Sequence, residues 1–421
     1  MAKFFSFLSR FLHRPPAVSH GRSIDTNLSI FREGDRVFVH GKNPLLTKPL
    51  RANDQTSARR GLLKHNDIIG KRSRDLVQAY KGPMYRVTYP TLEEYVTLTP
   101  RLVTPVYAPD ANLIVSLLDL HTFPPSSDGK EDEPLEILEA GTGHGSLTLH
   151  LSRAINAANT RPPPIPEAPQ RQILTDTPPT SKSSRPKNES AKDKAAVDNG
   201  QQRDWDVWRG QRRAIIHTVE VSPAHSAHAE SIVRGFRRGI YAGNVDFYVS
   251  SVENWVKEQI NRRHKYLFSG TVKPFLSYAI LDMPSAQLHI PHVASVLKYD
   301  GLLVVFMPNV TQIGDCVEII QKQRLPLVMD KAVELGMGIS SGRLWNIKST
   351  VPKRHSINMA SEEKEISKNE SEEDTSDDTY CEGVPSAEGA TEQESVLVCR
   401  PKVGGRIVGG GFVGIWRKIK E

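Results

Sequence analysis

The fold of this chain is decided by Leu138-Glu139-Ala140-Gly141-Thr142-Gly143-His144-Gly145-Ser146-Leu147-Thr148-Leu149. An apolar run ends in an acid, three alternating glycines follow, and a second apolar segment with helical spacing begins. This order predicts a strand, a tight turn and a helix. Glycine tolerates positive φ and lets a ligand approach the bare backbone. The first N–H groups of the helix lack intrahelical partners, so the stretch predicts a site for a nucleotide-like ligand.

The spacing of the glycines separates two kinds of nucleotide site. The dinucleotide fingerprint is Gly-x-Gly-x-x-Gly, and Ser146 stands where its third glycine should be. An acid followed by Gly-x-Gly-x-Gly resembles instead the first motif of S-adenosylmethionine (SAM)-dependent methyltransferases. One glycine-rich turn is weak evidence by itself, so the choice depends on the residues around it.

Composition limits the class of protein. At 421 residues the chain could hold two or three domains. No stretch approaches the roughly 18 consecutive apolar residues of a membrane span, so we expect no membrane partner. The three cysteines form no CxxC pair. We therefore expect neither a disulfide framework nor a metal site, and a reducing compartment fits.

Charge is distributed unevenly along the chain. The formal net charge is +7, yet residues 361–394 hold 13 acids and two lysines, a local charge of −11. The remainder therefore carries +18. A body this basic suits a polyanion, because phosphate neutralisation dominates nucleic-acid affinity. Composition alone is equally compatible with an ordinary basic surface.

The first 30 residues have the features of a targeting segment. No acid precedes Asp25, and Phe4, Phe7, Leu8 and Phe11 share one helical face. An amphipathic, acid-free leader with Arg and Ser is typical of a mitochondrial transit peptide. A disordered basic tail is the alternative, and the nucleus is the alternative compartment.

Residues 31–100 alternate between apolar and polar positions. We expect short strands at Arg36–His40, Tyr85–Thr88 and Tyr95–Leu98, and a polar loop over Lys42–Arg60. The segment therefore predicts a small β domain.

Residues 101–351 and 396–421 predict one α/β domain, because strands alternate with helices in the manner of a mostly parallel sheet. The expected helices are Asp110–Leu120 and Ala224–Arg237, and the expected strands are Ala214–Glu220, Val245–Val249, Tyr278–Leu281, Leu302–Met307 and Gly411–Trp416. Polar composition predicts two disordered inserts, 156–212 and the acidic 352–395.

Three acids lie at the ends of predicted strands: Glu139, Glu220 and Asp282. Ligands bind at the carboxyl ends of parallel strands, so these acids are expected to share one crevice. Glu220 suits the two ribose hydroxyls of a nucleoside-like cofactor, and Ser251 and Val252 would lie beside its adenine. For each acid alone an ordinary loop residue is the alternative, but the order of these features favours a site.

Six separated segments, in this order, carry a resemblance to a known family: Lys64–Lys71, Pro90–Tyr95, Thr104–Asp110, Leu281–Pro284, Pro308–Ile313 and Arg343–Trp345. They resemble the tRNA adenine-58 N1-methyltransferase (m1A58) family, and the match runs from about His65 to Lys418. That resemblance implies a Rossmann-like SAM-dependent methyltransferase domain preceded by a small N-terminal β domain that contacts tRNA.

The resemblance also implies roles for individual residues. Asp282 and Tyr107 would be catalytic, with Asp282 meeting the edge of the target adenine. For Arg343 and Trp345, a salt-bridged Arg and a core Trp are the alternatives to RNA contact. The implied SAM-binding residues are Val106, Glu139, Gly141, Thr142, Gly143, His144, Gly145, Ser146, Glu220, Ser251, Val252 and Asp282. The implied tRNA-binding residues are Lys71, Arg72, Arg343 and Trp345.

Several points stay open from the sequence. The family's final strand usually starts with His-Thr-Gly, whereas Gly409-Gly410-Gly411 stands here. The resemblance implies a homo-oligomer, a tetramer in bacterial-type relatives, or a heteromer with a non-catalytic subunit. The competing functions are a non-catalytic RNA-binding subunit and a SAM methyltransferase with another RNA or protein target. His144, inside the glycine turn, has no explanation.

Overall fold

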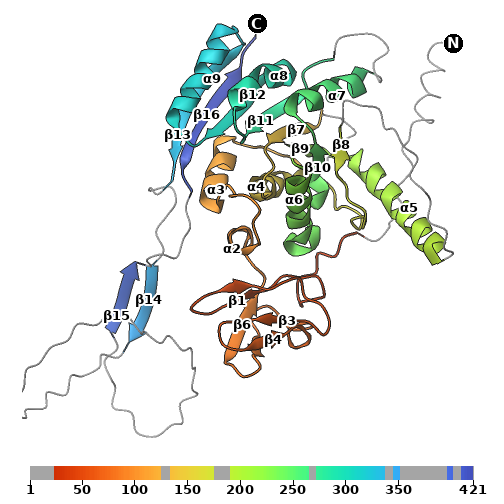
Figure 1. The fold of residues 1–421 in the computed structure, drawn as a ribbon, viewed down its shortest axis with the longest axis vertical. Coiled ribbons are helices and arrows are strands. Elements are labelled where there is room, and N and C mark those ends of the chain that lie inside the picture. The colour runs from red at the N-terminus through yellow and green to blue at the C-terminus, as the bar shows by residue number, and fades with distance from the viewer. Residues whose placement is uncertain are drawn as a thin grey trace, which may run out of the picture. The chain divides into compact units, whose positions relative to one another are not determined.

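The computed structural model describes residues 23–124, 133–174, 190–264, 272–336, 345–350, 396–401 and 409–420. It divides the chain into two units. The first comprises Met1–Ser341 with Val408–Glu421, and the second comprises Gly342–Ile407. Within the first unit, a small β domain precedes a larger α/β body (Figure 1).

The small β domain expected over residues 31–100 is present. Phe31, Leu50, Leu63 and Ile68 are fully buried in its core. The predicted loop at Lys42–Arg60 is wrong, because two of the strands lie inside it. Four strands form one sheet in the order β2-β1-β6-β5: β1 (Phe38–Val39), β2 (Leu45–Leu46), β5 (Leu76–Gln78) and β6 (Met84–Thr88). A second sheet pairs β3 (Gln55–Ser57) with β4 (Leu62–Lys64), which is followed by the 3-10 helix η1 (His65–Asp67).

The strand expected at Tyr95–Leu98 is wrong, because these residues belong to helix α2 (Leu92–Leu98). A capping box begins the helix: the Thr91 hydroxyl accepts from the Glu94 N–H at 3.2 Å, and the Glu94 carboxylate accepts from the Thr91 N–H at 2.8 Å. Such a reciprocal pair fixes a helix start. It outweighs the β-branched residues that indicated a strand.

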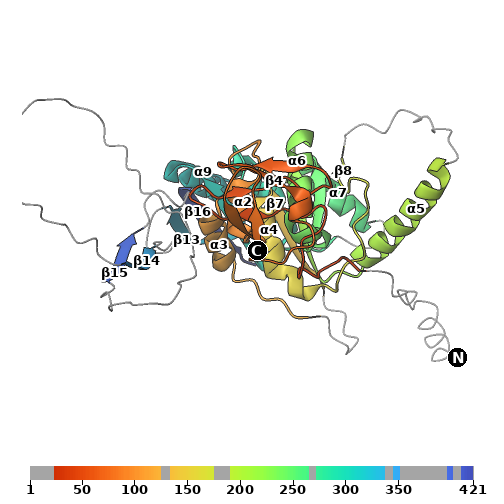
Figure 2. The same cartoon turned by 90° about the horizontal axis from the view of Figure 1, so that it is seen from below.

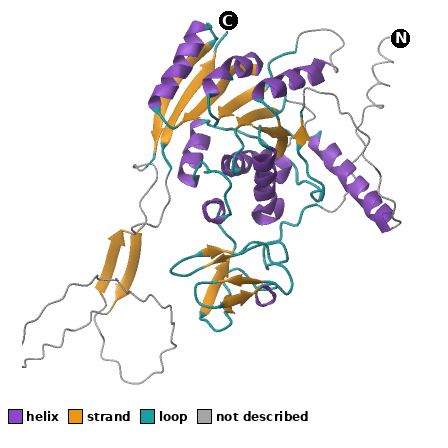
Figure 3. Cartoon of the chain, viewed as in Figure 1, coloured by secondary structure: helices purple, strands orange, loops and turns teal. Residues whose placement is uncertain are grey.

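The α/β body is built on an eight-stranded sheet, with helices on both of its faces (Figure 3). Its order is β13-β16-β12-β11-β7-β9-β10-β8, and β16 runs antiparallel to its two neighbours. If β7 is counted as strand 1, then β9, β10, β11, β12 and β13 are strands 2 to 6, and their order in space is the doubly wound order 3-2-1-4-5-6. Strand β16 lies between strands 5 and 6, and β8 lies beyond strand 3. The mostly parallel sheet is confirmed. The strands are β7 (Leu135–Ala140), β8 (Gln172–Ile173), β9 (Ala214–Glu220), β10 (Val245–Val249), β11 (Leu276–Leu281), β12 (Leu297–Met307), β13 (Leu327–Leu335) and β16 (Gly411–Lys418).

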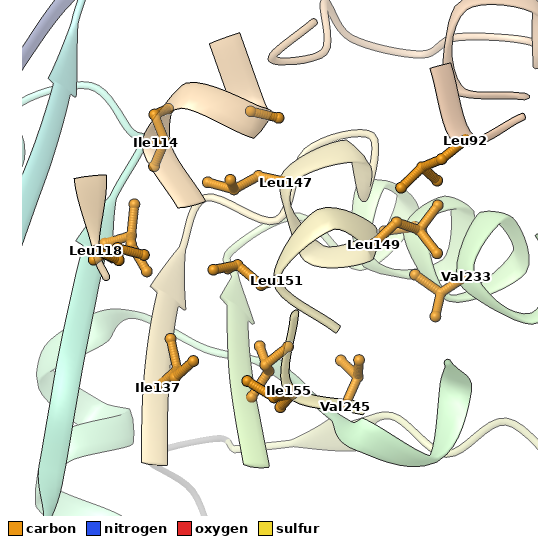
Figure 4. Packing of buried hydrophobic residues seen from close by; sticks show 14 of the residues in the cluster. Leu92, Ile114, Leu118, Ile137, Leu147, Leu149, Leu151, Ile155, Val233 and Val245 are labelled. Carbon is orange, nitrogen blue, oxygen red and sulfur yellow. The ribbon is translucent and has the colours of Figure 1, made fainter. Parts of the chain in front are cut away.

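Two apolar cores cover the sheet, one on each face. Ile114 and Leu147 from two helices meet Ile137 of β7 in the first core (Figure 4). Trp255 and Trp416 belong to the second. Burial on both faces explains why the strands are continuous apolar runs. The first face carries α3 (Ala108–Leu117), α4 (Ser146–Ile155) and α6 (Pro223–Gly235), and the second carries α7 (Val252–His264), α8 (Ile290–Val296) and α9 (Val310–Lys322). Four 3-10 helices complete the body: η2 (Asn156–Ala158), η3 (Phe236–Gly239), η4 (Ala242–Asn244) and η5 (Ala286–Leu288).

The disorder expected over residues 156–212 is wrong for the described parts of this insert. Strand β8 extends the sheet by pairing with β10, and helix α5 (Ser190–Arg209) lies at the periphery of the body (Figures 1 and 2). Trp205 and Trp208 are buried, and Trp208 Nε1 donates to Thr160 Oγ1 at 2.9 Å. The polar composition hid these two tryptophans, which supply the apolar surface that the insert needs in order to fold.

A buried ion pair anchors the end of the insert. Arg212 binds both carboxylate oxygens of Asp246 on β10, at 2.9 and 2.8 Å, and Arg209 adds a contact of 2.8 Å. Burial opposes ionisation of Asp246, yet the two guanidinium groups hold its pKa well below the usual range. Fixed donors of this kind lock the insert to the sheet.

The boundary expected at residue 30 is also wrong, because residues 23–30 belong to the folded unit. The Ile24 N–H donates to the Pro162 carbonyl at 3.1 Å, and the Ile24 side chain is buried. Arg238 binds Asp25 and the Ile30 carbonyl. The candidate leader is thereby reduced to residues 1–22, which lie outside the described residues.

The second unit contains an antiparallel pair, β14 (Trp345–Thr350) with β15 (Val396–Pro401). The predicted methyltransferase domain includes these residues, and this part of the prediction is wrong. The two strands pair with each other rather than with the large sheet, and they belong to the second unit. The acidic insert 352–395 lies outside the described residues. Among the described helices, none has the length and apolarity to cross a membrane.

Trp208→Ala tests the folded insert. We expect the free energy of unfolding to fall by about 3–5 kcal/mol, because a buried indole and its hydrogen bond are lost. Val207→Ala on the same helix is the control, since Val207 is 43% exposed, and it should cost under about 0.5 kcal/mol. Denaturant unfolding measures both. Equal stability of the two variants would contradict the packing of α5.

Candidate active site

The glycine turn lies where the ends of β7 and β11 meet. Gly141, Gly143 and Gly145 have φ of +91°, +53° and +83°. A Cβ on Gly141 would lie 1.8 Å from the carbonyl oxygen of Asp282, so only glycine fits. The Asp282 N–H donates to the Ala140 carbonyl at 2.8 Å. The topological switch point of the sheet, the usual ligand crevice of such folds, therefore holds both the turn and Asp282.

A hollow opens at this point of the fold. Its lining includes eight of the predicted site residues: Val106, Glu139, Gly141, Thr142, Gly143, His144, Ser146 and Asp282. Thr104, Pro105 and Leu147 line it as well. The predicted Tyr107, Gly145, Glu220, Ser251 and Val252 are outside this lining.

Glu220 adjoins the hollow through the backbone of the glycine turn. Its carboxylate accepts from the Gly143 N–H at 3.1 Å and from the Ser222 N–H at 3.0 Å. A carboxylate offers about four acceptor positions, so two stay available for hydroxyl donors of a ligand. Ser251 instead accepts from the Asn254 N–H at the start of α7, and Val252 is buried in the core.

Glu139, Glu220 and Asp282 lie close enough for their charges to interact, and burial raises the pKa of two of them. Burial raises the pKa of Glu139 to about 8, although Thr148 donates a 2.7 Å hydrogen bond to it. Burial also raises the pKa of Asp282 to about 7, with a further contribution from the charge of Glu220. Burial therefore favours the protonated form of Glu139 at neutral pH, and it moves the titration of Asp282 towards that pH.

The structure explains His144. Its Nε2 lies 3.0 Å from Thr99 Oγ1, and its Nδ1 lies 3.2 Å from His228 Nε2. Thr99 donates its own hydrogen to the Tyr95 carbonyl, so it accepts from His144. Burial lowers the pKa of His144 to about 4. A neutral imidazole therefore ties the glycine turn to the residue after α2 and to α6.

Tyr107 lies at the start of α3, against Gly409, which precedes the final strand β16. A Cβ on Gly409 would lie 3.2 Å from the Tyr107 ring and 2.4 Å from the Asp110 carboxylate. The Tyr107 hydroxyl accepts from Arg101 at 3.0 Å. A histidine at position 409 would need these side chains to move.

The expected RNA-binding residues fall in different parts of the chain. Lys71 and Arg72 are exposed on the β domain. Trp345 begins β14, and Arg343 lies outside the described residues. In the described part of the chain, no three His, Cys, Asp or Glu side chains gather as metal ligands.

Thr99, His228 and Thr218 were missed by sequence reasoning. Thr99 and His228 bind His144 across 45 and 84 residues, and Thr218 lies 2.6 Å from Thr142 across 76 residues. No local pattern reports such contacts. Thr104 and Pro105 also line the hollow, although the family resemblance implies no role for them. Their position next to Val106 in the sequence is the feature that indicates their place in the lining.

The strand order, the glycine turn and the acid at the end of β9 define the fold of a Rossmann-like SAM-dependent methyltransferase. A solved SAM-dependent O-methyltransferase from Thermotoga maritima has this fold, with a TM-score of 0.53 and 13% identity over 93% of this chain and 96% of its own. In sequence, the chain is similar to the curated tRNA (adenine(58)-N(1))-methyltransferase TrmI from each of two strains of Thermus thermophilus. Each is 24% identical over 292 residues, which is 69% of this chain and 79% of the relative. These relatives confirm the resemblance to the m1A58 family. A comparison with protein-family models found no match to the chain.

Gly141→Ala tests the contact between the turn and β11. We expect SAM affinity to fall by more than about tenfold and the melting temperature to drop, because a Cβ overlaps the Asp282 backbone. Gly70→Ala is the matched control: its φ is +86°, but no atom lies within 4 Å of the new Cβ, so it carries only the conformational cost of about 1–2 kcal/mol. Calorimetry and thermal unfolding measure both. Identical behaviour of the two variants would refute the close approach.

Proposed function

We propose that the chain is the catalytic subunit of a methyltransferase that methylates N1 of adenine 58 in the T-loop of tRNA. The observation that carries this is Asp282, whose backbone is held after β11 against the glycine turn and which lines the hollow. The sequence similarity to the TrmI enzymes supports the tRNA target.

The residues present fit SAM. The positive-φ glycines leave the backbone open to a ligand, and the Glu220 carboxylate lies beside them with acceptor positions for ribose hydroxyls. SAM supplies a methyl group that its sulfonium already activates. Gly141, Gly143 and Gly145 would hold the methionine part, Glu220 the ribose, and the segment from Ser251 the adenine.

Asp282 supplies the electrostatic part of the reaction. Adenine N1 is a weak nucleophile, and methylation leaves a cationic ring. A carboxylate that accepts from the exocyclic amine raises electron density at N1 and stabilises the developing charge. Holding the base in line provides further acceleration. The N1 edge of a paired adenine is occupied, so the base must leave its helix first, and Tyr107 would line or stack on it.

Two competing functions have less support. A non-catalytic subunit has no need of an intact turn or of Asp282, yet both are present and in contact. A SAM methyltransferase with another target leaves the β domain and the charge of +18 outside the acidic insert without a role.

We also propose a homo-oligomer, with a heteromer as the alternative. The bacterial form of the motifs at Thr104–Tyr107 and Pro308–Ile313 supports the tetramer.

Asp282→Asn tests the chemistry. We expect kcat on a tRNA transcript to fall by about 10²–10³-fold, with a much smaller change in SAM affinity. Because the raised pKa keeps Asp282 protonated below about pH 7, wild-type kcat should rise from pH 6 to pH 8, whereas the Asn variant should show a flat profile. Labelled SAM reports both. The proposal fails if wild type leaves tRNA unlabelled, or if the variant matches it.

We propose a mitochondrial location, with residues 1–22 as the leader. A reporter fused to these residues should enter mitochondria, and the variant Lys3→Glu, Arg10→Glu, Arg14→Glu should not, because import peptides need positive charge. Fluorescence microscopy reads the outcome. Nuclear or cytosolic signal from the unaltered leader would contradict it.

A further inference from the structure

One face of the β domain exposes large apolar and basic side chains together. Leu76, Tyr80 and Met84 are 48%, 54% and 57% exposed. Leu76 lies opposite Arg86, and Gln78 lies opposite Met84, across β5 and β6. Burial alternates along these strands, with Val77, Ala79 and Val87 facing the core, so the exposed residues share the outer face.

Two lysine ammonium groups lie over the aromatic ring on this face. The Lys64 and Lys81 ammonium nitrogens lie 5.6 and 5.5 Å from the centroid of the Tyr80 ring. Lys64 reaches this face because Leu62, two residues before it, pairs with Tyr80. In the described part of the chain, neither lysine forms a salt bridge with a carboxylate. We call Lys64, Leu76, Tyr80, Lys81, Met84 and Arg86 the Tyr80 surface.

The positive charge of the sequence around the Tyr80 surface indicates a negatively charged partner. Residues 51–90 contain nine Lys and Arg against three acids, a local charge of +6. An acidic peptide would use the lysines but leave the aromatic face without a role. An unpaired nucleotide uses both, since its base stacks on an exposed ring and its phosphates meet the flanking cations.

We propose that the Tyr80 surface binds RNA by stacking an unpaired base on Tyr80, with the Lys64 and Lys81 ammonium groups moving from the ring to the neighbouring phosphates. This contact lies on the β domain, whereas Asp282 follows β11 in the α/β body. The proposal rests on the proposed function and deepens it, because it names how the substrate is held away from the catalytic crevice.

Tyr80→Ala in the full-length protein should raise the Kd for an unmodified tRNA transcript by about tenfold, whereas Tyr80→Phe should bind like wild type, because the π face remains. The matched control is Tyr299→Ala. Tyr299 is 63% exposed, with the Lys420 nitrogen 5.5 Å from its centroid, but it lies on β12 in the α/β body. The control should leave the Kd unchanged. Fluorescence anisotropy measures binding, and SAM calorimetry with thermal unfolding verifies that each variant is folded.

The salt dependence separates stacking from charge. The double variant Lys64→Ala, Lys81→Ala should reduce the slope of log Kd against log salt by about 1.5, whereas Tyr80→Ala should leave that slope unchanged. A Tyr80→Ala protein that binds tRNA like wild type would overturn the proposal. Equal losses with Tyr299→Ala, or displacement of RNA by poly-glutamate with no dependence on Tyr80, would do so as well.

The outcome remains separable from that of the proposed function. Oligo(U) is the second probe, because it has unpaired bases but no adenine. Tyr80-dependent binding of oligo(U) by a wild type that fails to methylate tRNA would support the surface and reject the methylation of adenine 58. If wild type methylates tRNA and Tyr80→Ala has no effect on RNA binding, the proposed function would be supported and the Tyr80 surface would be rejected as an RNA contact.

Discussion

The approach of the Gly141 α-carbon to the Asp282 carbonyl is the constraint on which the site depends. A Cβ there would lie 1.8 Å from that oxygen, so the ends of β7 and β11 can meet only at glycine. The two strands pair directly at the centre of the sheet, and the chain crosses to opposite faces on leaving them. One contact therefore brings the turn and the acid into the same crevice.

Burial then sets the charges in that crevice. Glu139, Glu220 and Asp282 approach one another in a poorly solvated space, where carboxylates resist ionisation together. Burial raises the pKa of Glu139 to about 8 and that of Asp282 to about 7, while the Glu220 carboxylate accepts hydrogen bonds from the Gly143 and Ser222 N–H groups. His144 stays neutral for the same reason. The fold thus leaves Asp282 able to exchange charge near neutral pH.

A second polar junction fixes the β domain to the α/β body. Arg238, at φ +60°, donates to both carboxylate oxygens of buried Asp35 at 2.8 and 2.7 Å, and to the Tyr89 hydroxyl at 3.0 Å. Several donors of one planar guanidinium are therefore satisfied at once. The β domain, and with it the Tyr80 surface, is held in a defined place relative to the crevice.

The sequence by itself determined the glycine turn, the main strands of the parallel sheet and the three acids, because each is written in a short local pattern. Tertiary structure decided the partners of His144, the helix at Leu92–Leu98, the folding of the insert around Trp208 and the fit of Gly409 against Tyr107. These depend on contacts between residues far apart in the chain, such as the 84 positions that separate His144 from His228. Local periodicity reports which face of an element is apolar, but it carries no information about which distant side chain will complete a hydrogen bond or fill a space.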